Sequence, residues 1–211
     1  MTDTTVELEE LNRQIAACRR CRLGQMRTRA VPGTGPAQAQ IMFIGEAPGF
    51  HEDRQGLPFV GAAGKFLDQL LASINLKRED VFIANVIKCR PPGNRDPKPD
   101  ETTACRSHLD RQIELVRPRI IITLGRFSMA RYFPGASIPR IHGRPKRSGG
   151  VIYYPMFHPA AALHQPRWRP LIEEDMKQIP ALLAELQGVE SDLPETQEIY
   201  QQLTLFGKDS T

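Results

Sequence analysis

The sequence lacks any stretch of apolar residues long enough to cross a bilayer, which takes about 20 consecutive residues. Its first ten residues, MTDTTVELEE, are acidic and polar, so they do not form a secretory signal. It also contains no internal repeat and no low-complexity segment. We therefore expect a globular cytoplasmic protein that has no membrane as a partner.

Aromatic residues are scarce at 7%, with one tryptophan, yet 40% of the residues are hydrophobic and 25% are charged. These proportions are ordinary for a globular protein, and 211 residues suffice for one α/β domain with short extensions. The net charge of +4 is unevenly distributed, because residues 188–211 hold five acidic residues against one lysine. The rest of the chain carries +8, which favours a polyanionic partner, although basic surfaces are common without one.

Cysteine is limited to four residues, spaced as C-x2-C and then C-x15-C after a long gap: Cys18, Cys21, Cys89 and Cys105. Without an export signal, disulfides are the less favoured use of these thiols. Four thiolates can close a tetrahedral zinc site or hold an iron–sulfur cluster. Cys89 alone would suit a small buried hydrophobic residue. The four together, with none left over, favour a metal centre.

Hydrophobic runs predict four buried strands, at residues 41–45, 81–88, 120–124 and 151–157. Helical spacing or helix start signals predict helices between and around them, at residues 5–17, 62–74, 100–116, 126–133 and about 167–186. The polar stretch from 50 to 57 and the segments 27–40, 89–99 and 134–150 are expected to be loops. This alternation predicts a three-layer α/β/α fold with a central four-stranded parallel sheet.

The stretch around which we expect the site to form is residues 41–64, IMFIGEAPGFHEDRQGLPFVGAAG. Its GEAPG turn follows the first strand, and ligands of parallel sheets bind at that edge. Glycines let the backbone approach a ligand closely. Phe59 adds a flat ring, while Asn85 and His158 come at the ends of two further strands. A carboxylate, an amide, an imidazole and a ring are thus predicted in one crevice.

Four features resemble the family 4 uracil-DNA glycosylases, the iron–sulfur-containing branch of that superfamily: GEAPG with PFVG, NVIKCRPP, MFHPAAAL and the cysteine spacing. The resemblance covers about residues 10–185. It implies a [4Fe–4S] cluster held by the four cysteines and removal of uracil from DNA. We therefore expect a monomeric, nucleoid-associated base excision repair enzyme, with the glycosylase domain at 1–187, that hydrolyses the N-glycosidic bond and leaves an abasic site.

The chemistry of this reaction suggests a role for each residue of the crevice. A base inside a duplex must be flipped into a pocket, where Phe59 would stack on it. The Asn85 amide would donate to a uracil carbonyl and accept from the ring N–H. His158, whose charge state the sequence leaves open, would donate to the developing oxyanion of the leaving base. Backbone N–H groups around Ala47 and the side chain of Asn94 complete the expected uracil contacts.

The role of the motif's carboxylate is less determined. Glu46 would polarise the attacking water or stabilise the sugar cation. Better-known branches of the superfamily carry an aspartate one position later, where this chain has Ala47. Glu52 is a weaker candidate for a place near the substrate. The nearest lysine, Lys88, is expected to point away, so we predict a monofunctional enzyme.

Basic residues between 134 and 150 are candidates for phosphate contact, with a solvated surface loop as the equal alternative. The predicted DNA-binding residues are Arg140, Arg144 and Arg147, together with Arg167 near the last helix. Arg140-Ile141-His142 also matches an Arg-Ile-His motif with which a related branch traps uracil-DNA covalently. In that branch the motif lies in the loop after the second strand, so we interpret the match as coincidental and expect turnover.

Two other classes of function compete with the enzyme. One is a uracil-DNA binding or covalent-trapping protein that does not turn over, and the other is a zinc-containing nucleotide-binding module without chemistry. Polar residues at three separate strand ends, Glu46, Asn85 and His158, favour the enzyme over both.

The segment 188–211 is expected to be a flexible acidic tail. Its QLTLF string resembles the bacterial sliding-clamp-binding pentapeptide, which assigns clamp-binding roles to Gln202, Leu203, Leu205 and Phe206. Exposed apolar residues at a terminus favour an anchor for a partner groove. The alternative is that the tail folds back onto its own domain.

Overall fold

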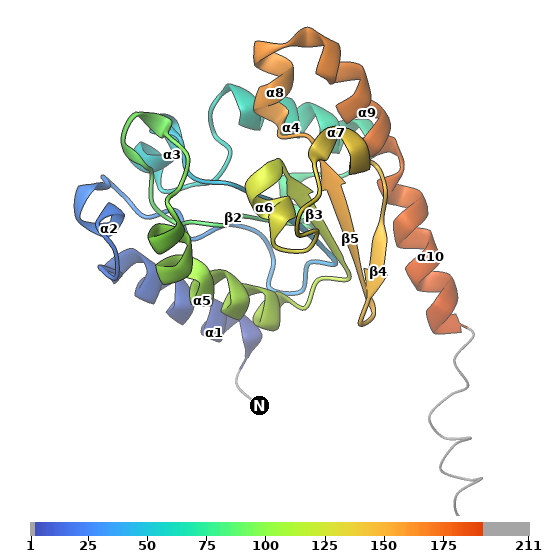
Figure 1. The fold of residues 1–211 in the computed structure, drawn as a ribbon. Coiled ribbons are helices and arrows are strands. Elements are labelled where there is room, and N and C mark those ends of the chain that lie inside the picture. The colour runs from blue at the N-terminus through green and yellow to red at the C-terminus, as the bar shows by residue number, and fades with distance from the viewer. Residues whose placement is uncertain (1–2, 192–211) are drawn as a thin grey trace, which may run out of the picture.

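The structure, a computed structural model, describes residues 3–191, whose central sheet has the strand order β2-β1-β3-β5-β4 (Figure 1). The strands are β1 (Ile41–Gly45), β2 (Phe82–Asn85), β3 (Ile120–Leu124), β4 (Lys146–Ser148) and β5 (Val151–Met156). β1, β2, β3 and β5 are parallel, as predicted, and β4 pairs antiparallel with β5. Figure 1 shows helices on both sides of the sheet, so the three-layer α/β/α prediction is confirmed.

The longer helices are α1 (Thr4–Ala17), α4 (Ala62–Ser73), α5 (Pro99–Val116), α9 (Arg169–Lys177) and α10 (Ile179–Ser191). The shorter ones are α2 (Leu23–Met26), α3 (Phe50–Gln55), α6 (Arg126–Ala130), α7 (Ile138–Ile141) and α8 (Pro159–His164). The described residues also form the 3-10 turns η1 (Arg78–Asp80), η2 (Pro92–Asn94) and η3 (Pro166–Trp168). Among the described residues, no helix has the length and apolar character needed to span a membrane.

Side chains of β1 alternate between two hydrophobic cores. Ile41 and Phe43 join the core formed with α4, α9 and α10, whereas Met42 and Ile44 join the core formed with α1 and α5. Both sets are fully buried, which explains why β1 reads as a continuous apolar run and not as an alternating one. The sheet is thereby clamped between two helical layers, and its carboxyl edge is fixed from both faces.

Several of the predicted elements differ from those of the structure. The expected loop 50–57 contains α3, which Gly49 caps and which ends at the left-handed Gly56. β2 ends at Asn85 and not at 88, so Asn85 terminates the strand and does not interrupt it. The expected basic loop contains α7 and β4, and β4 turns into β5 through two glycines at positive φ, Gly149 and Gly150.

The expected last helix is broken into α9 and α10 at Gln178. Pro180 lies in the first turn of α10, and its missing N–H ends the hydrogen-bond ladder of α9. α10 continues to Ser191, so the expected boundary at 187 falls inside a helix. Residues 192–211, which carry the four predicted clamp-binding residues, lie outside the described part of the chain.

The outer edge of β2 is covered by the loop that precedes β1. Thr34 and Ile83 form an antiparallel bridge, with N–H to C=O distances of 2.9 and 2.7 Å. Glycines at positive φ flank the bridge, and a Cβ on Gly35 would lie 2.2 Å from the Val81 carbonyl oxygen. The loop can approach this edge because the residues on either side of Thr34 are glycines without side chains.

Candidate active site

A cavity of about 770 Å³ lies at the carboxyl edge of the sheet, where β1, β2 and β5 end. We call it the strand-end cavity. All six residues predicted for catalysis or base binding line it: Glu46, Ala47, Phe59, Asn85, Asn94 and His158. Four segments far apart in the sequence thus meet at the edge where parallel sheets bind ligands.

Asn85 lies at the inner wall of this cavity, at the last position of β2. It pairs in register with Gly45 of β1, and a Cβ on Gly45 would come within 2.4 Å of the Asn85 Oδ1 atom. The side chain is 2% exposed, and its Oδ1 has no hydrogen-bond partner among the described residues. A buried acceptor without a partner is costly, so this one is suited to a donor from a ligand.

The ring of Phe59 forms a second wall. It is buried and lies stacked against the His158 ring, with 5.5 Å between ring centroids and 25° between planes. Gly45 is again essential, since a Cβ there would lie 2.8 Å from the Phe59 Cζ atom. The backbone of Phe59 has a φ of 54°, a left-handed value that residues other than glycine seldom adopt.

His158 follows β5 and caps the N-terminus of α8. Its Nδ1 atom accepts a hydrogen bond from the Ala160 N–H at 3.1 Å. Burial lowers the pKa of His158 to about 4, partly opposed by the charge of Glu52. The ring is therefore neutral at pH 7, and because Nδ1 accepts, the proton resides on Nε2. Burial thus favours the neutral form of this imidazole, whose charge state the sequence left open.

Glu46 and Ala47 form the turn that follows β1. The Glu46 side chain is half-buried, and burial followed by the nearby charge of Asp96 raises its pKa, while Arg126 acts in the opposite direction. The turn is fixed to the chain beyond β2, because the Ile87 N–H donates to the Glu46 carbonyl at 3.1 Å. A carboxylate of raised basicity is thus held at the cavity.

Asn94 lies at the exposed rim with a φ of 55°, and its Oδ1 accepts from the Arg90 Nε at 2.7 Å. Sequence reasoning missed other titratable side chains of the lining, among them Asp96 and His164. Asp96 forms an ion pair with Arg126, and it occupies a proline-rich segment in which no periodicity could single it out.

The four cysteines line a second, smaller cavity together with Arg27, Lys88 and His108. We call it the cysteine cavity. Within residues 3–191 no three side chains of the metal-binding types are arranged to hold a metal ion. A cluster of four irons is larger than one ion, however, and needs thiolates around a space and not around a point. The donor set of four thiols at one cavity fits such a cluster.

Basic groups surround the cysteine cavity. The Arg27 Nη1 donates to the Cys89 sulfur at 2.9 Å, and the Lys88 N–H donates to the Cys105 sulfur at 3.3 Å. Burial nevertheless raises the pKa of the Cys89 thiol to about 11 and also raises that of Cys105. The protein alone therefore favours neutral thiols here, and a positively charged metal centre would reverse that preference.

Comparison with known proteins identifies the family. The model of the uracil DNA glycosylase superfamily matches residues 32–184. The chain belongs to this superfamily. A type-4 uracil-DNA glycosylase of Sulfurisphaera tokodaii is 49% identical over 83% of this chain and 84% of its own length. The type-4 enzymes of Archaeoglobus fulgidus and Saccharolobus solfataricus are 46% and 47% identical, over 85% and 81% of this chain and 95% and 84% of theirs.

In this superfamily member, one of the four predicted DNA-binding arginines, Arg147, lies away from the carboxyl edge of the sheet. Arg140 and Arg144 are exposed, and the N–H of Gly143, between them, donates to Pro155 near the end of β5. Exposed Arg167 lies over the Trp168 ring. Arg147 instead pairs with Ile152 near the start of β5, and its guanidinium forms two 2.5 Å bonds to Glu185 of α10. Arg147 is therefore separated from the strand-end cavity.

Two further side chains bear on the type of glycosylase chemistry. His142 lies outside the cavity lining, and its Nδ1 contacts the buried Asp175 carboxylate at 2.9 Å. The buried Lys88 ammonium donates to the Gln112 Oε1 atom of α5 at 2.6 Å and to the Asn85 carbonyl at 2.8 Å, and Lys88 is not among the residues that line the strand-end cavity. Neither group is placed to attack a sugar there.

Proposed function

We propose that this chain is a monofunctional uracil-DNA glycosylase, which hydrolyses the N-glycosidic bond of uracil in DNA and leaves an abasic site for base excision repair. The observation that carries the proposal is the Asn85 Oδ1, which has no hydrogen-bond partner in the described part of the chain and lies at a cavity walled by Phe59 and neutral His158. Membership in the superfamily and the names of its relatives support it.

Asn85 would select the base. Uracil carries a hydrogen on ring atom N3, which the free Oδ1 can accept, whereas neutral cytosine has a lone pair there. The Asn85 amide N–H₂ would donate to a neighbouring carbonyl of uracil, where cytosine presents an amino group on one side. Because the groups left behind by the wrong base would be buried and unpaired, discrimination is strong.

His158 would stabilise the leaving base. As the glycosidic bond breaks, negative charge develops on uracil, and the Nε2–H of neutral His158 would donate to a uracil oxygen. The Ala160 N–H holds the ring from the opposite nitrogen, so the donor is oriented before the substrate arrives. The base must be flipped out of the helix to reach this cavity.

Glu46 would act on the water. With its pKa raised by burial, its carboxylate is a stronger base than an exposed glutamate and also places negative charge near the developing sugar cation. Ala47 offers backbone and no carboxylate, so this role falls to Glu46 and not to the following residue. Asn94 at the rim would contact the base or its sugar.

The cysteine cavity would hold a [4Fe–4S] cluster through Cys18, Cys21, Cys89 and Cys105. Its contribution would be structural, because hydrolysis changes no oxidation state. Arg27 and the Lys88 N–H would stabilise the negative charge of the thiolates. The cluster would join the N-terminal segment to residues 89–105, which also supply the cavity rim.

The enzyme would act as a monomer. Its DNA substrate would lie across the mouth of the strand-end cavity. Arg140, Arg144 and Arg167 would contact phosphates, and Leu163 of α8, which is 50% exposed, would enter the gap left by the flipped nucleotide. The tail residues Gln202, Leu203, Leu205 and Phe206 would bind a bacterial sliding clamp, which would keep this cytoplasmic enzyme at the nucleoid.

The experiment is excision from an oligonucleotide that contains one uracil, followed by alkali. We expect strand breaks at uracil after alkali only, and none in a matched thymine oligonucleotide. Breaks without alkali, or a borohydride-trapped adduct, would contradict a monofunctional enzyme. Intact DNA after alkali, at protein in excess over DNA, would contradict the proposed function itself.

A further inference from the structure

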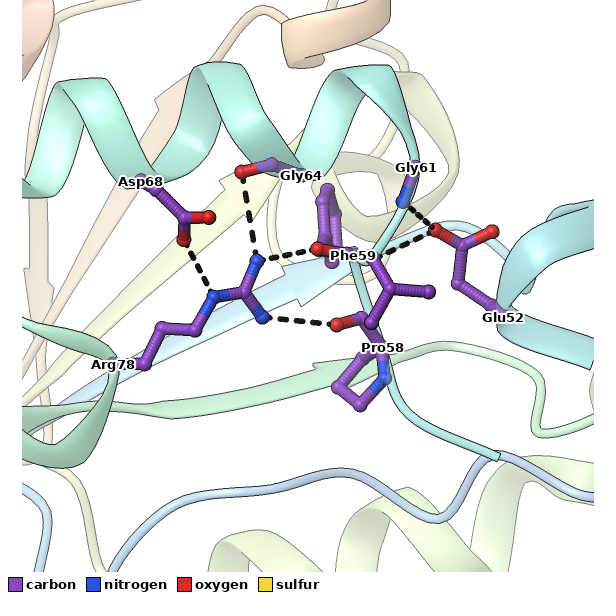
Figure 2. Close-up of polar contacts among 8 residues, drawn as sticks. Glu52, Pro58, Phe59, Gly61, Gly64, Asp68 and Arg78 are labelled. Atoms are coloured by element: carbon purple, nitrogen blue, oxygen red, sulfur yellow. Dashed lines mark hydrogen bonds and ion pairs between the residues drawn. The ribbon is translucent and has the colours of Figure 1, made fainter. Parts of the chain in front are cut away.

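The turn that carries Phe59 is held by a network outside the strand-end cavity. Arg78 of η1 lies behind the turn and lines a separate hollow on the far side of Phe59. Its Nη1 donates to the Pro58 carbonyl at 3.0 Å, and its Nη2 donates to the Phe59 carbonyl and, at 3.5 Å, to that of Gly64. Its Nε is paired with Asp68 of α4 at 2.5 Å (Figure 2).

Glu52 of α3 holds the same turn from the opposite side. One of its carboxylate oxygens accepts from the N–H groups of Val60 and Gly61, each at 2.9 Å. Figure 2 shows Arg78 and Glu52 on either side of the backbone of Phe59. The peptide group between Phe59 and Val60 is thus bonded at its carbonyl by Arg78 and at its N–H by Glu52.

The hydrogen bonds from Arg78 and Glu52 matter because the backbone of the turn is strained. Phe59 has a φ of 54°, which a side chain with a Cβ adopts at a cost in free energy. The carbonyl of Phe59 also presses against α4, where a Cβ on Gly64 would lie 1.7 Å from that oxygen. A strained conformation persists only where its surroundings over-determine it. The planar guanidinium, which binds two successive carbonyls at once, supplies that constraint.

We propose that Arg78, acting with Glu52, is a positioning residue that presets the Phe59 ring for stacking on the extruded base. The inference rests on the proposed uracil-DNA glycosylase function. Arg78 does not line the strand-end cavity, so it acts on the cavity through the backbone of the turn that carries Phe59. Without it, the turn relaxes to ordinary φ values and the ring leaves its place beside His158.

The test compares Arg78→Met and Arg78→Lys with a matched control, Arg111→Met. Arg111 of α5 is also an arginine paired with carboxylates, those of Glu7 and Glu114, but it lies on the face of α1 and α5. We expect Arg78→Met to lower the single-turnover rate of uracil excision by roughly 10- to 100-fold, because a small misplacement of a reacting group has effects of that size. Arg111→Met stays at the wild-type rate.

Three readouts separate positioning from a general structural role. Inhibition by free uracil weakens in Arg78→Met, whereas affinity for DNA with a stable abasic-site analogue, which has no base to stack, stays unchanged. Arg78→Lys, which keeps the charge but cannot bridge two carbonyls, falls between wild type and Arg78→Met. In a Phe59→Leu background, Arg78→Met adds little further loss, since the ring it positions is gone.

Wild-type excision rates and uracil inhibition in Arg78→Met would overturn the inference. So would a parallel loss of excision and of abasic-site binding, which would indicate a misfolded domain, or a full additional loss in the Phe59→Leu background. If Arg78→Met does not fold, Arg78→Lys is subject to the same comparisons. An inactive wild-type protein would instead refute the proposed function, so the two failures are distinguishable.

Discussion

The strand-end cavity and the cysteine cavity are built in different ways. The strand-end cavity takes its main residues from the carboxyl ends of parallel strands and from the segments that follow them, and Gly45 and Asn85 are paired in the register of the sheet itself. The cysteine cavity takes its sulfurs from the segment after α1, from the loop after β2 and from α5. Within residues 3–191, no strand pairing joins these three segments at the cysteines.

The difference indicates which site depends on a bound group. At the strand-end cavity the acceptor of Asn85 is unpaired but already in place, because backbone hydrogen bonds fix its strand. At the cysteine cavity burial raises the pKa of Cys89 and Cys105, so without a metal centre these thiols favour the neutral form, in which they attract the nearby cations less strongly. We infer that the first site is preformed and that the second is completed by its metal centre.

The largest effect is expected when a hydrogen-bond donor is removed from the strand-end cavity, which tests whether that site is preformed. His158→Ala and Asn85→Ala should each lower the single-turnover rate of uracil excision by about 10²–10³-fold, the usual effect of losing one donor to a developing oxyanion. The fold should persist, measured by circular dichroism and melting temperature. The control is Asn12→Ala, which deletes another amide with a partnerless buried Oδ1 on α1. A fully active His158→Ala enzyme would refute the assignment.

The next effect comes from the metal centre. Cys18→Ala or Cys105→Ala should abolish the iron content and the visible absorbance at about 400 nm, and should lower the melting temperature by on the order of 10 °C, because a metal-held segment loses its staple. Free uracil should still bind at low temperature if the strand-end cavity is preformed. Full iron content in either variant, or complete loss of uracil binding, would contradict the contrast drawn between the two sites.

A smaller effect distinguishes the titrating groups of the strand-end cavity. The pKa of Glu46 is raised, so excision should slow as the pH falls through that value, before His158 takes a proton near pH 4. Glu46→Gln should lower the rate and remove the first step of the decline.

The stability of the fold should also decrease as the pH falls. Histidine in the unfolded chain binds its proton near pH 6.5, so the contribution of neutral His158 to the free energy of unfolding is lost as the pH falls from 6.5 towards 4. A His158 imidazole that titrates near pH 6.5 by NMR would contradict this prediction.

The smallest effect concerns the arginines. Replacing Arg140 and Arg144 by alanine should weaken binding to all DNA sequences alike and reduce the slope of log affinity against log salt by roughly one unit per lost phosphate contact. Arg147→Ala serves as the control, because Arg147 is engaged by Glu185 at the opposite end of β5. Equal slopes for the two variants would place the phosphate contacts elsewhere.

The sequence predicted the layers and the strand-end cavity because both follow from patterns that are local. Apolar runs mark buried strands, and the parallel topology brings the residues after each strand to one edge. Arg147 was beyond such reasoning, since its partner Glu185 lies 38 residues away on a helix that packs beside β4 and β5. The left-handed φ of Phe59 was equally hidden, because phenylalanine normally disfavours it and the contacts of Arg78 and Glu52 that hold this turn come from outside it in the sequence.

α3 was missed for a third reason. Its six residues, FHEDRQ, are too few to display a helical period and carry four charged or titratable side chains. The helix forms because glycines bound it on both sides and because Asp53 accepts the Thr28 N–H, at 3.0 Å, from a segment 25 residues earlier. Tertiary contacts and not local preference therefore decide this segment.

The two edges of the sheet affect the tendency of the protein to aggregate at high concentration. An exposed strand edge is a template on which other chains add strands and aggregate. Here the β2 edge is occupied by Thr34, and the opposite edge ends in β4, three exposed residues of which two are cationic. If the protein gathers at high local concentration along DNA, these blocked edges oppose strand exchange between copies and favour its remaining dispersed and soluble.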